Sequence, residues 1–180
     1  MHNVINIKSE ILFREAEDYF LYFGKTKKAI QKLDEAIILT PYHTKSLVLR
    51  GDISFISGKI DEALNLYEKA YTTFSNDSKI LGAIATCLES KEDYRKALSY
   101  CDKAFLFINE NNCQLLQSLY ELKISILLRL KEYKKAQKLI ADAKYNLSTE
   151  EIIKFKNHRE VINIKLKIKE KIKSSSLHVL

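Results

Sequence analysis

Apolar and polar residues between Ser46 and Tyr71 follow the three- and four-residue spacing of amphipathic helices. The pattern predicts two short helices joined by a tight turn at residues 57–59, Ser-Gly-Lys. Gly51 falls inside the first of these helices, where a glycine costs about 1 kcal/mol relative to alanine. We therefore expect a neighbouring helix to pack closely against its bare Cα. Such a hairpin cannot bury its apolar face alone, so the pattern predicts neighbouring hairpins of the same kind.

Small residues repeat this pattern along the chain. Alanines two turns apart in the second helix of each copy recur after 34, 34 and 39 residues: Ala29 and Ala36, Ala63 and Ala70, Ala97 and Ala104, Ala136 and Ala143. Tyr67 lies between the alanines of the second copy, where we expect it to fill the space beside a close helix contact. The longer last step indicates about five inserted residues between Phe107 and Cys113.

A 34-residue period built of helix–turn–helix units resembles the tetratricopeptide repeat (TPR) family over roughly residues 10–146. The best-matched stretch follows Pro41 and carries Gly51, Asp52, Gly58, Asp61, Glu62, Ala63, Tyr67 and Ala70. The chain departs from the family pattern at Glu17 and Ile124, where a small residue is usual, and at Cys101, which stands in an aromatic position. The resemblance implies an all-α fold, a right-handed α-solenoid of four TPR-like helical hairpins, which we expect to end in a C-terminal capping helix.

The predicted organisation has a lead-in, four repeats, a capping segment and a tail. The helices are expected at residues 9–23, 26–39, 44–57, 60–74, 79–90, 94–109, 112–130 and 133–144. The segments are a lead-in over 1–9, repeats over 10–43, 44–77, 78–116 and 117–146, a basic capping helix within 147–173, and a flexible tail over 174–180. Ser148 and Glu151 form a capping-box pattern that opens the last helix. Residues 164–169 alternate with the period of a strand, but no other strand is predicted to pair with them, so we favour a helix.

Composition agrees with a helical protein of the cytoplasm. Four glycines and one proline in 180 residues are too few for a fold with many tight turns. The three cysteines lack CxxC spacing, and we interpret Cys87 and Cys101 as small buried hydrophobes in a reducing compartment. The sequence shows neither a secretory signal pattern nor an apolar stretch of the roughly 18–20 residues that a membrane span needs.

No catalytic motif is present in the sequence. It lacks a glycine-rich phosphate loop, a GxSxG elbow and an HExxH motif. The four histidines are not spaced to share a metal with one another or with a cysteine. We therefore expect a non-enzymatic protein with no cofactor and no metal.

The resemblance implies a binding groove, because the first helices of successive TPR repeats line a concave surface that holds a peptide or helix of another protein. Carried over position by position, the groove residues are Arg14, Asp18 and Tyr22 in the first repeat, Lys45, Val48, Asp52 and Phe55 in the second, Lys79, Thr86 and Glu89 in the third, and Glu121, Ser125 and Arg129 in the fourth. The alternative is that some of these side chains pack against the neighbouring first helix or face water.

The acidic groove positions bear on the ligand. A known TPR subtype clamps the C-terminal carboxylate of heat-shock chaperones with a lysine and, one turn on, an asparagine. Arg14 and Asp18 occupy these positions here, and Asp52 replaces a neutral amide in the next repeat. Carboxylates would repel an acidic tail. We expect instead a partner segment with apolar anchors and some positive charge.

The net charge of +7 is partly concentrated near the C-terminus. The basic surface predicted there consists of Lys165, Lys167, Lys169, Lys171 and Lys173. The favoured function is that of a scaffold: a protein–protein interaction module, adaptor or chaperone, that binds another protein. The alternatives are a nucleic-acid or anionic-surface binding module that uses the basic helix, and an accessory subunit of an enzyme or of a bacterial secretion complex. Nucleic acid is not the favoured partner, since the basic stretch has few aromatic residues, and self-association is left open.

Overall fold

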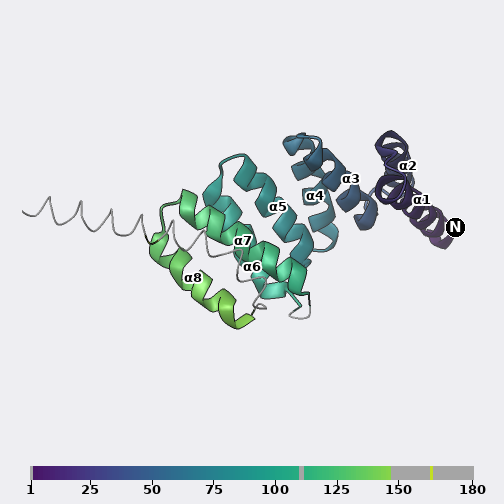
Figure 1. Cartoon of the computed structure of the whole chain (residues 1–180). Helices are drawn as coiled ribbons and strands as arrows, with labels where there is room; N and C mark the ends of the chain where they lie inside the picture. The colour runs from purple at the N-terminus through teal and green to yellow at the C-terminus, as the bar shows by residue number, and fades with distance from the viewer. Residues whose placement is uncertain (1, 110–111, 147–162, 164–180) are drawn as a thin grey trace, which may run out of the picture. The chain divides into compact units, whose positions relative to one another are not determined.

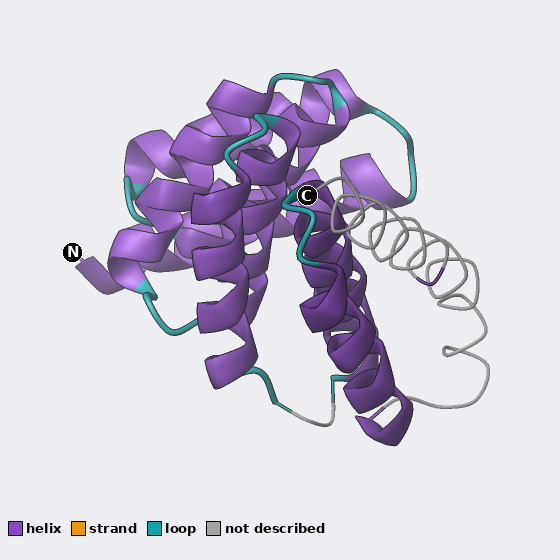
Figure 2. Ribbon diagram, turned by 90° about the vertical axis from the view of Figure 1, so that its left-hand side faces the viewer, coloured by secondary structure: helices purple, strands orange, loops and turns teal. Residues whose placement is uncertain are grey.

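The computed structural model describes residues 2–109, 112–146 and 163, and eight helices make up most of this part (Figure 1). Their bounds are α1 His2–Leu21, α2 Thr26–Leu39, α3 Thr44–Ile56, α4 Ile60–Thr73, α5 Ser78–Ser90, α6 Tyr94–Phe107, α7 Cys113–Arg129 and α8 Tyr133–Asn146. The described segments are helices joined by short loops (Figure 2). The chain divides into two compact units, residues 1–93 and 94–180.

All eight predicted repeat helices are present, and most of their ends lie within two residues of the prediction. The main difference is at the N-terminus, where α1 begins at His2, inside the segment expected to be a lead-in. Neither proline nor glycine occurs before Ser9 to stop a helix there. The hydroxyl of Ser9 lies 2.8 Å from that of Thr40, so the first turns of α1 lead directly into a packed contact.

The insertion before the fourth repeat lies ahead of α7. This helix has 17 residues and begins at Cys113, so the boundary predicted between residues 116 and 117 falls inside it. The expected capping helix, the tail and the lysines at 165, 167, 169, 171 and 173 lie outside the described residues.

The turn inside each hairpin carries the same repeat period as the alanines. One residue per turn has a positive φ, and these residues are Gly24 (61°), Gly58 (76°), Glu92 (62°) and Lys131 (60°), which stand 34, 34 and 39 residues apart. In the second turn the amide of Lys59 donates to the carbonyl of Ser54 at 2.9 Å. The amides of Asp93 and Glu132 make the same bond with the carbonyls five residues before them. A hydrogen bond from an amide to the carbonyl five residues before it is typical of the Schellman motif at the C-terminal end of a helix. The backbone conformation of the turns therefore repeats along the chain together with the alanines.

The core of the first unit lies between two helical hairpins and α5. Helix α1 packs on α2, α3 packs on α4, and both α2 with α3 and α4 with α5 are in contact. The alanines at 29, 36, 63 and 70 are completely buried. Ala29 belongs to one apolar cluster with Phe13, Ala16, Leu33 and Ile53. The small residues therefore lie where the helices approach one another, as the sequence predicted.

Gly51 in α3 is packed against Tyr67 in α4. A Cβ atom built on this glycine would lie 2.6 Å from Cε1 of the tyrosine ring, which is closer than such atoms approach in real proteins. The ring is itself buried, with 3% of its surface exposed. The expected close contact at Gly51 is confirmed, and its partner is an aromatic side chain.

The second unit has its own apolar core between α6, α7 and α8. Tyr120, Ile124 and Ile140 are buried there together with the alanines at 136 and 143. The Phe105 ring meets the Tyr120 ring edge-on, with 5.0 Å between ring centroids. Ile124 replaces a small family residue and is fully buried in this core.

The two cysteines interpreted as core residues are buried. Burial raises the pKa of the Cys87 thiol to about 11 and that of the Cys101 thiol to about 12. Cys101 stands in the aromatic position of its repeat and lies 3.7 Å from the carbonyl oxygen of Leu119 in α7. Both thiols are therefore neutral near pH 7 and pack as small apolar side chains.

Candidate functional site

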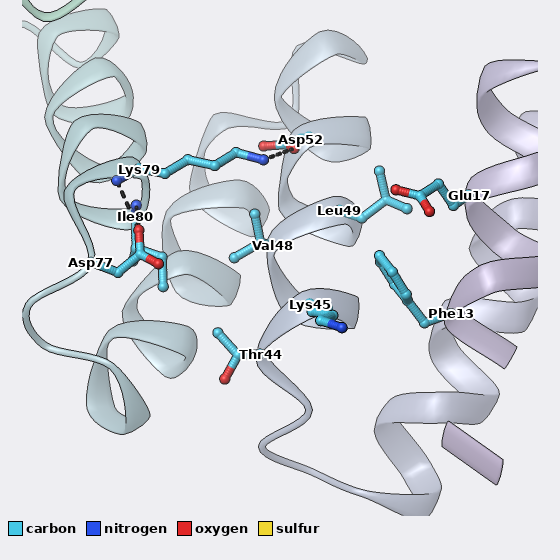
Figure 3. A pocket seen from close by; sticks show the side chains of 10 residues that line it. All are labelled: Phe13, Glu17, Thr44, Lys45, Val48, Leu49, Asp52, Asp77, Lys79 and Ile80. Atoms are coloured by element: carbon cyan, nitrogen blue, oxygen red, sulfur yellow. Dashed lines mark hydrogen bonds and ion pairs between the residues drawn. The ribbon is translucent and has the colours of Figure 1, made fainter. Parts of the chain in front are cut away.

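A surface hollow of about 220 Å³ opens on the first unit, where α1, α3 and α5 each contribute side chains (Figure 3). These are the first helices of three successive predicted repeats. The hollow is defined by Phe13, Glu17, Thr44, Lys45, Val48, Leu49, Asp52, Asp77, Lys79 and Ile80. Apolar and charged groups are mixed in its wall, which is a composition suited to a segment with both kinds of side chain.

The apolar part of the wall belongs to the core. Phe13 and Val48 are 8% and 9% exposed, and Ile80 is 1% exposed. Because these side chains are held by the packing of three helices, the apolar surface of the hollow is formed before any ligand arrives. A rigid, pre-formed surface lowers the entropy cost of binding.

Asp52 lies at the hollow and is held by a residue beneath it. Its Oδ1 accepts a hydrogen bond of 2.6 Å from the hydroxyl of Tyr67. Its Oδ2 lies 3.9 Å from Nζ of Lys79, which reaches across from α5 (Figure 3). Burial and the bond to Asp52 both raise the pKa of the Tyr67 hydroxyl above its ordinary value, so the phenol keeps its proton and remains the donor.

Lys45, the other lysine of the hollow, forms an ion pair with a residue that does not line the hollow. Lys45 Nζ lies 2.8 Å from Oε1 of Glu10 and 5.8 Å from the centre of the Phe13 ring. Glu10 Oε2 is also 3.3 Å from Nε2 of His43. The hydrogen bond from Lys45 is the main cause that lowers the pKa of Glu10. The positive charge of Lys45 is therefore balanced by its neighbour in α1.

Asp77 has a structural role at the start of α5. Its Oδ1 accepts hydrogen bonds from the backbone amides of Lys79 at 2.8 Å and Ile80 at 3.1 Å. These are the bonds of an N-cap, which satisfies amides that have no partner in the first turn of a helix. The cap fixes the end of α5 that carries Lys79 and Ile80 into the hollow.

Four of the groove residues expected from the resemblance gather in the hollow, and they are Lys45, Val48, Asp52 and Lys79. The hydroxyl of Thr86 bonds to the carbonyl of Gly82, and Phe55 and Glu89 are half-buried. On α1, Arg14 and Asp18 are exposed, while Tyr22 lies in the turn after the helix and is 78% exposed.

The α7 positions belong to the second unit. Glu121 accepts a hydrogen bond of 2.8 Å from Gln117, Ser125 is half-buried, and Arg129 is exposed in the last turn. None of these α7 side chains lines the hollow described above.

Six residues of the hollow were not expected from the sequence. They are Phe13, Glu17, Thr44, Leu49, Asp77 and Ile80. Phe13 and Ile80 belong to the apolar faces of their helices, and this periodicity indicates burial without showing that they lie beside a surface hollow. Asp77 carries the pattern of a cap, which indicates a helix start rather than a site.

Within residues 2–109, 112–146 and 163, no group of three or more histidine, cysteine, aspartate or glutamate side chains could hold a metal ion. The helices of this same part of the chain are each too short or too polar to cross a membrane.

Neither a protein-family model nor a curated protein matches the sequence. Solved structures do match the fold. PilF of Pseudomonas aeruginosa has a TM-score of 0.69 at 15% identity, over 87% of this chain and 71% of its own. MamA of Desulfovibrio magneticus RS-1, from residue 41 to its end, has a TM-score of 0.67 at 15% identity, over 77% of this chain and 75% of its own.

A third solved structure includes a bound peptide. It is titled the first TPR of Spaghetti (RPAP3) bound to the HSP90 peptide SRMEEVD, and its TM-score is 0.59 at 16% identity, over 67% of this chain and 97% of its own. At such identities, the likeness is evidence for the fold alone.

Proposed function

We propose that this chain, which has the all-α tetratricopeptide-repeat fold, is a protein–protein interaction module that binds a segment of a partner protein in the hollow between α1, α3 and α5. Proteins of this fold generally serve as interaction modules, and one neighbour has a peptide bound. The partner segment is expected to be a peptide or a helix, and the role that of an adaptor or chaperone in the cytoplasm.

One observation carries the proposal: three successive first helices contribute to a single surface hollow with an apolar wall and charged edges. Val48 and Leu49 from α3 lie between the contributions of α1 and α5 (Figure 3). A bound segment would bury this apolar surface, and burial stabilises a complex by about 25 cal/mol per Å² before the costs of association. Apolar anchors on the partner would supply most of this energy, whereas the charged edge would select among partners.

The experiment is site-specific photo-crosslinking with a benzoylphenylalanine residue placed at Thr44, at the hollow. The matched control carries the same residue at Asn65, which is exposed on α4 and lies outside the hollow. The two full-length proteins are irradiated in the lysate of cells that express them, and crosslinked peptides are identified by mass spectrometry.

We expect Thr44 to capture one recurrent segment of a partner protein that Asn65 does not capture. Equal capture from both positions would contradict the proposal, since binding would then not be located at the hollow. No capture from Thr44, with normal folding of the variant by circular dichroism, would contradict it as well.

A further inference from the structure

Asp52 differs from the other charged groups of the hollow, because it is fixed from inside the protein. The hydroxyl of Tyr67 donates to Oδ1 at 2.6 Å, and the tyrosine ring is packed against Gly51. The Asp52 side chain remains 33% exposed. The result is a carboxylate held in one orientation, with its second oxygen, Oδ2, available at the surface.

The position of Lys79 indicates that Oδ2 of Asp52 attracts a cationic group. Its ammonium group lies 3.9 Å from Oδ2, at the outer limit of an ion pair, while 65% of the lysine side chain is exposed. Exposed pairs of this kind contribute little to stability, so the lysine is easily displaced. In the free protein, Lys79 therefore occupies the position that a cationic side chain of a partner would take.

Two of the three remaining charged groups of the hollow offer less to a ligand, whereas the third, Glu17, is a second carboxylate on the α1 side. The positive charge of Lys45 is paired with Glu10 at 2.8 Å, and the carboxylate of Asp77 caps α5. The first unit has twelve lysine and arginine residues against fourteen aspartate and glutamate residues, a net charge of −2, although the whole chain carries +7. The unit that carries the hollow is thus not itself positive.

We infer that Asp52 is the specificity-determining residue of the hollow and selects a lysine or arginine side chain in the partner segment. This inference rests on the proposed function. The methylene groups of the incoming side chain would lie on the apolar wall at Val48, and its charged end would replace Lys79 at Oδ2 of Asp52. Lys79 then acts as an internal competitor, which lowers the affinity for any cationic partner.

The test uses the full-length chain labelled with ¹⁵N and titrated with four synthetic peptides. The peptides are capped at both ends, carry flanking leucines as anchors, and differ at one central residue, which is lysine, arginine, glutamine or glutamate. Changes in amide shifts give the dissociation constants and show whether the amides of Val48 and Ile80 respond. Titrations are repeated in about 0.1 M and about 1 M salt, where screening lengths are roughly 10 Å and 3 Å.

Three variants separate the role of Asp52 from that of Lys79. Asp52→Asn keeps an oxygen acceptor for the Tyr67 hydroxyl while removing the charge. Lys79→Gln removes the competitor. Lys69→Gln, at an exposed position on α4, removes the same charge away from the hollow.

In low salt we expect the lysine and arginine peptides to bind about three- to tenfold more tightly than the glutamine peptide, and the glutamate peptide to bind most weakly. Asp52→Asn should abolish the preference. Lys79→Gln should tighten binding of the lysine peptide about threefold more than Lys69→Gln does. If Asp52 had only a structural role, Asp52→Asn would not abolish the preference for a cationic peptide, and Lys79→Gln would not strengthen the binding of one.

Equal binding by all four peptides, with shifts at Val48 and Ile80, would overturn the inference and leave the proposed function intact. An unchanged preference in a folded Asp52→Asn protein would also overturn it, as would a Lys79→Gln effect no larger than that of Lys69→Gln. If none of the peptides shifts the amides of the hollow, both the inference and the proposed function are wrong.

Discussion

The ring of Tyr67 lies so close to Gly51 that a Cβ on the glycine would stand 2.6 Å from Cε1 of the ring. The tyrosine cannot easily move aside, because its hydroxyl is bonded to Asp52 at 2.6 Å and its ring is buried. A glycine in mid-helix is therefore explained by the packing of α4 on α3.

This contact predicts that Gly51→Ala lowers the free energy of unfolding by about 1–3 kcal/mol, as overpacked cores do. Alanine favours a helix over glycine by about 1 kcal/mol. A lower free energy of unfolding therefore indicates that overpacking dominates, and a higher one that helix propensity dominates. Urea unfolding followed by circular dichroism measures it. In a Tyr67→Leu background the same substitution should be neutral or stabilising. A more stable Gly51→Ala protein with Tyr67 present would contradict the close contact.

The positive φ of Glu92 predicts a second stability change. Residues with side chains are strained by about 1 kcal/mol in this conformation, whereas glycine adopts it freely. Glu92→Gly should therefore raise the free energy of unfolding by roughly 0.5–1 kcal/mol, and Gly58→Ala, at the matching turn, should lower it by a similar amount. Glu92→Ala controls for loss of the carboxylate and should not stabilise the protein. Thermal unfolding of the four proteins gives the comparison.

Arg50 predicts a third change, because its side chain joins three helices. Its Nε lies 3.1 Å from Asp34 of α2, its Nη2 lies 2.7 Å from Glu62 of α4, and its side chain is only 13% exposed. Arg50→Met should cost about 1–3 kcal/mol, a range that allows for partial solvent screening of the two carboxylates. Arg14→Met removes an exposed pair with Glu10 and should change stability by at most about 0.5 kcal/mol. Equal effects in urea unfolding would contradict this role.

His43 predicts how stability depends on pH. Burial lowers its pKa below the ordinary 6.5, although the bond with Glu10 partly offsets this. The unfolded chain therefore binds a proton more readily than the folded one, and the contribution of His43 to stability, present above pH 6.5, is lost as the pH falls toward its folded pKa. Urea midpoints at pH 7.5 and pH 5.5 should show this decrease. His43→Gln should reduce it, and an unchanged pH dependence in that variant would exclude His43 as the cause.

The HSP90 peptide SRMEEVD provides a test of ligand charge. We expect it not to bind saturably to this chain, because Asp52 places negative charge at the hollow and Asp18, which is exposed on α1, adds negative charge to a first helix. Fluorescence anisotropy with a labelled peptide measures this. The double variant Asp18→Asn/Asp52→Asn should bind it more tightly than the natural chain. Strong binding by the natural chain would show that the acidic positions do not govern the choice of ligand.

The fold was predictable because repeated small residues mark places where helix backbones must approach. The completely buried alanines confirm the repeat, and the four turns of positive φ repeat with the same spacing. The start of α1 was missed because no cap or breaker marks it. That Gly51 needed a close neighbour was also predictable. That the neighbour is Tyr67 was not, because helical spacing does not specify which side chain of α4 faces a given residue of α3.

The hollow was predictable in part. The resemblance places Lys45, Val48 and Asp52 on one face of a first helix, and the structure brings them to the hollow. Phe13 and Glu17 were missed, because which residues of α1 face α3 depends on the angle at which the two helices cross. The bond between Tyr67 and Asp52 joins residues 15 positions apart in different helices, and no periodicity predicts such a pair.

The same bond limits how this surface can change in evolution. Asp52 serves the interior through one oxygen and the exterior through the other. A substitution of Asp52 that changes ligand preference must keep a hydrogen-bond acceptor for the Tyr67 hydroxyl. Asparagine meets this condition, whereas an aliphatic or basic residue would leave a buried hydroxyl without its hydrogen bond. Lineages that acquire a new ligand preference at the hollow should therefore first replace Lys79, because its side chain is exposed and, within the part of the chain that the structure describes, bonds to no buried group.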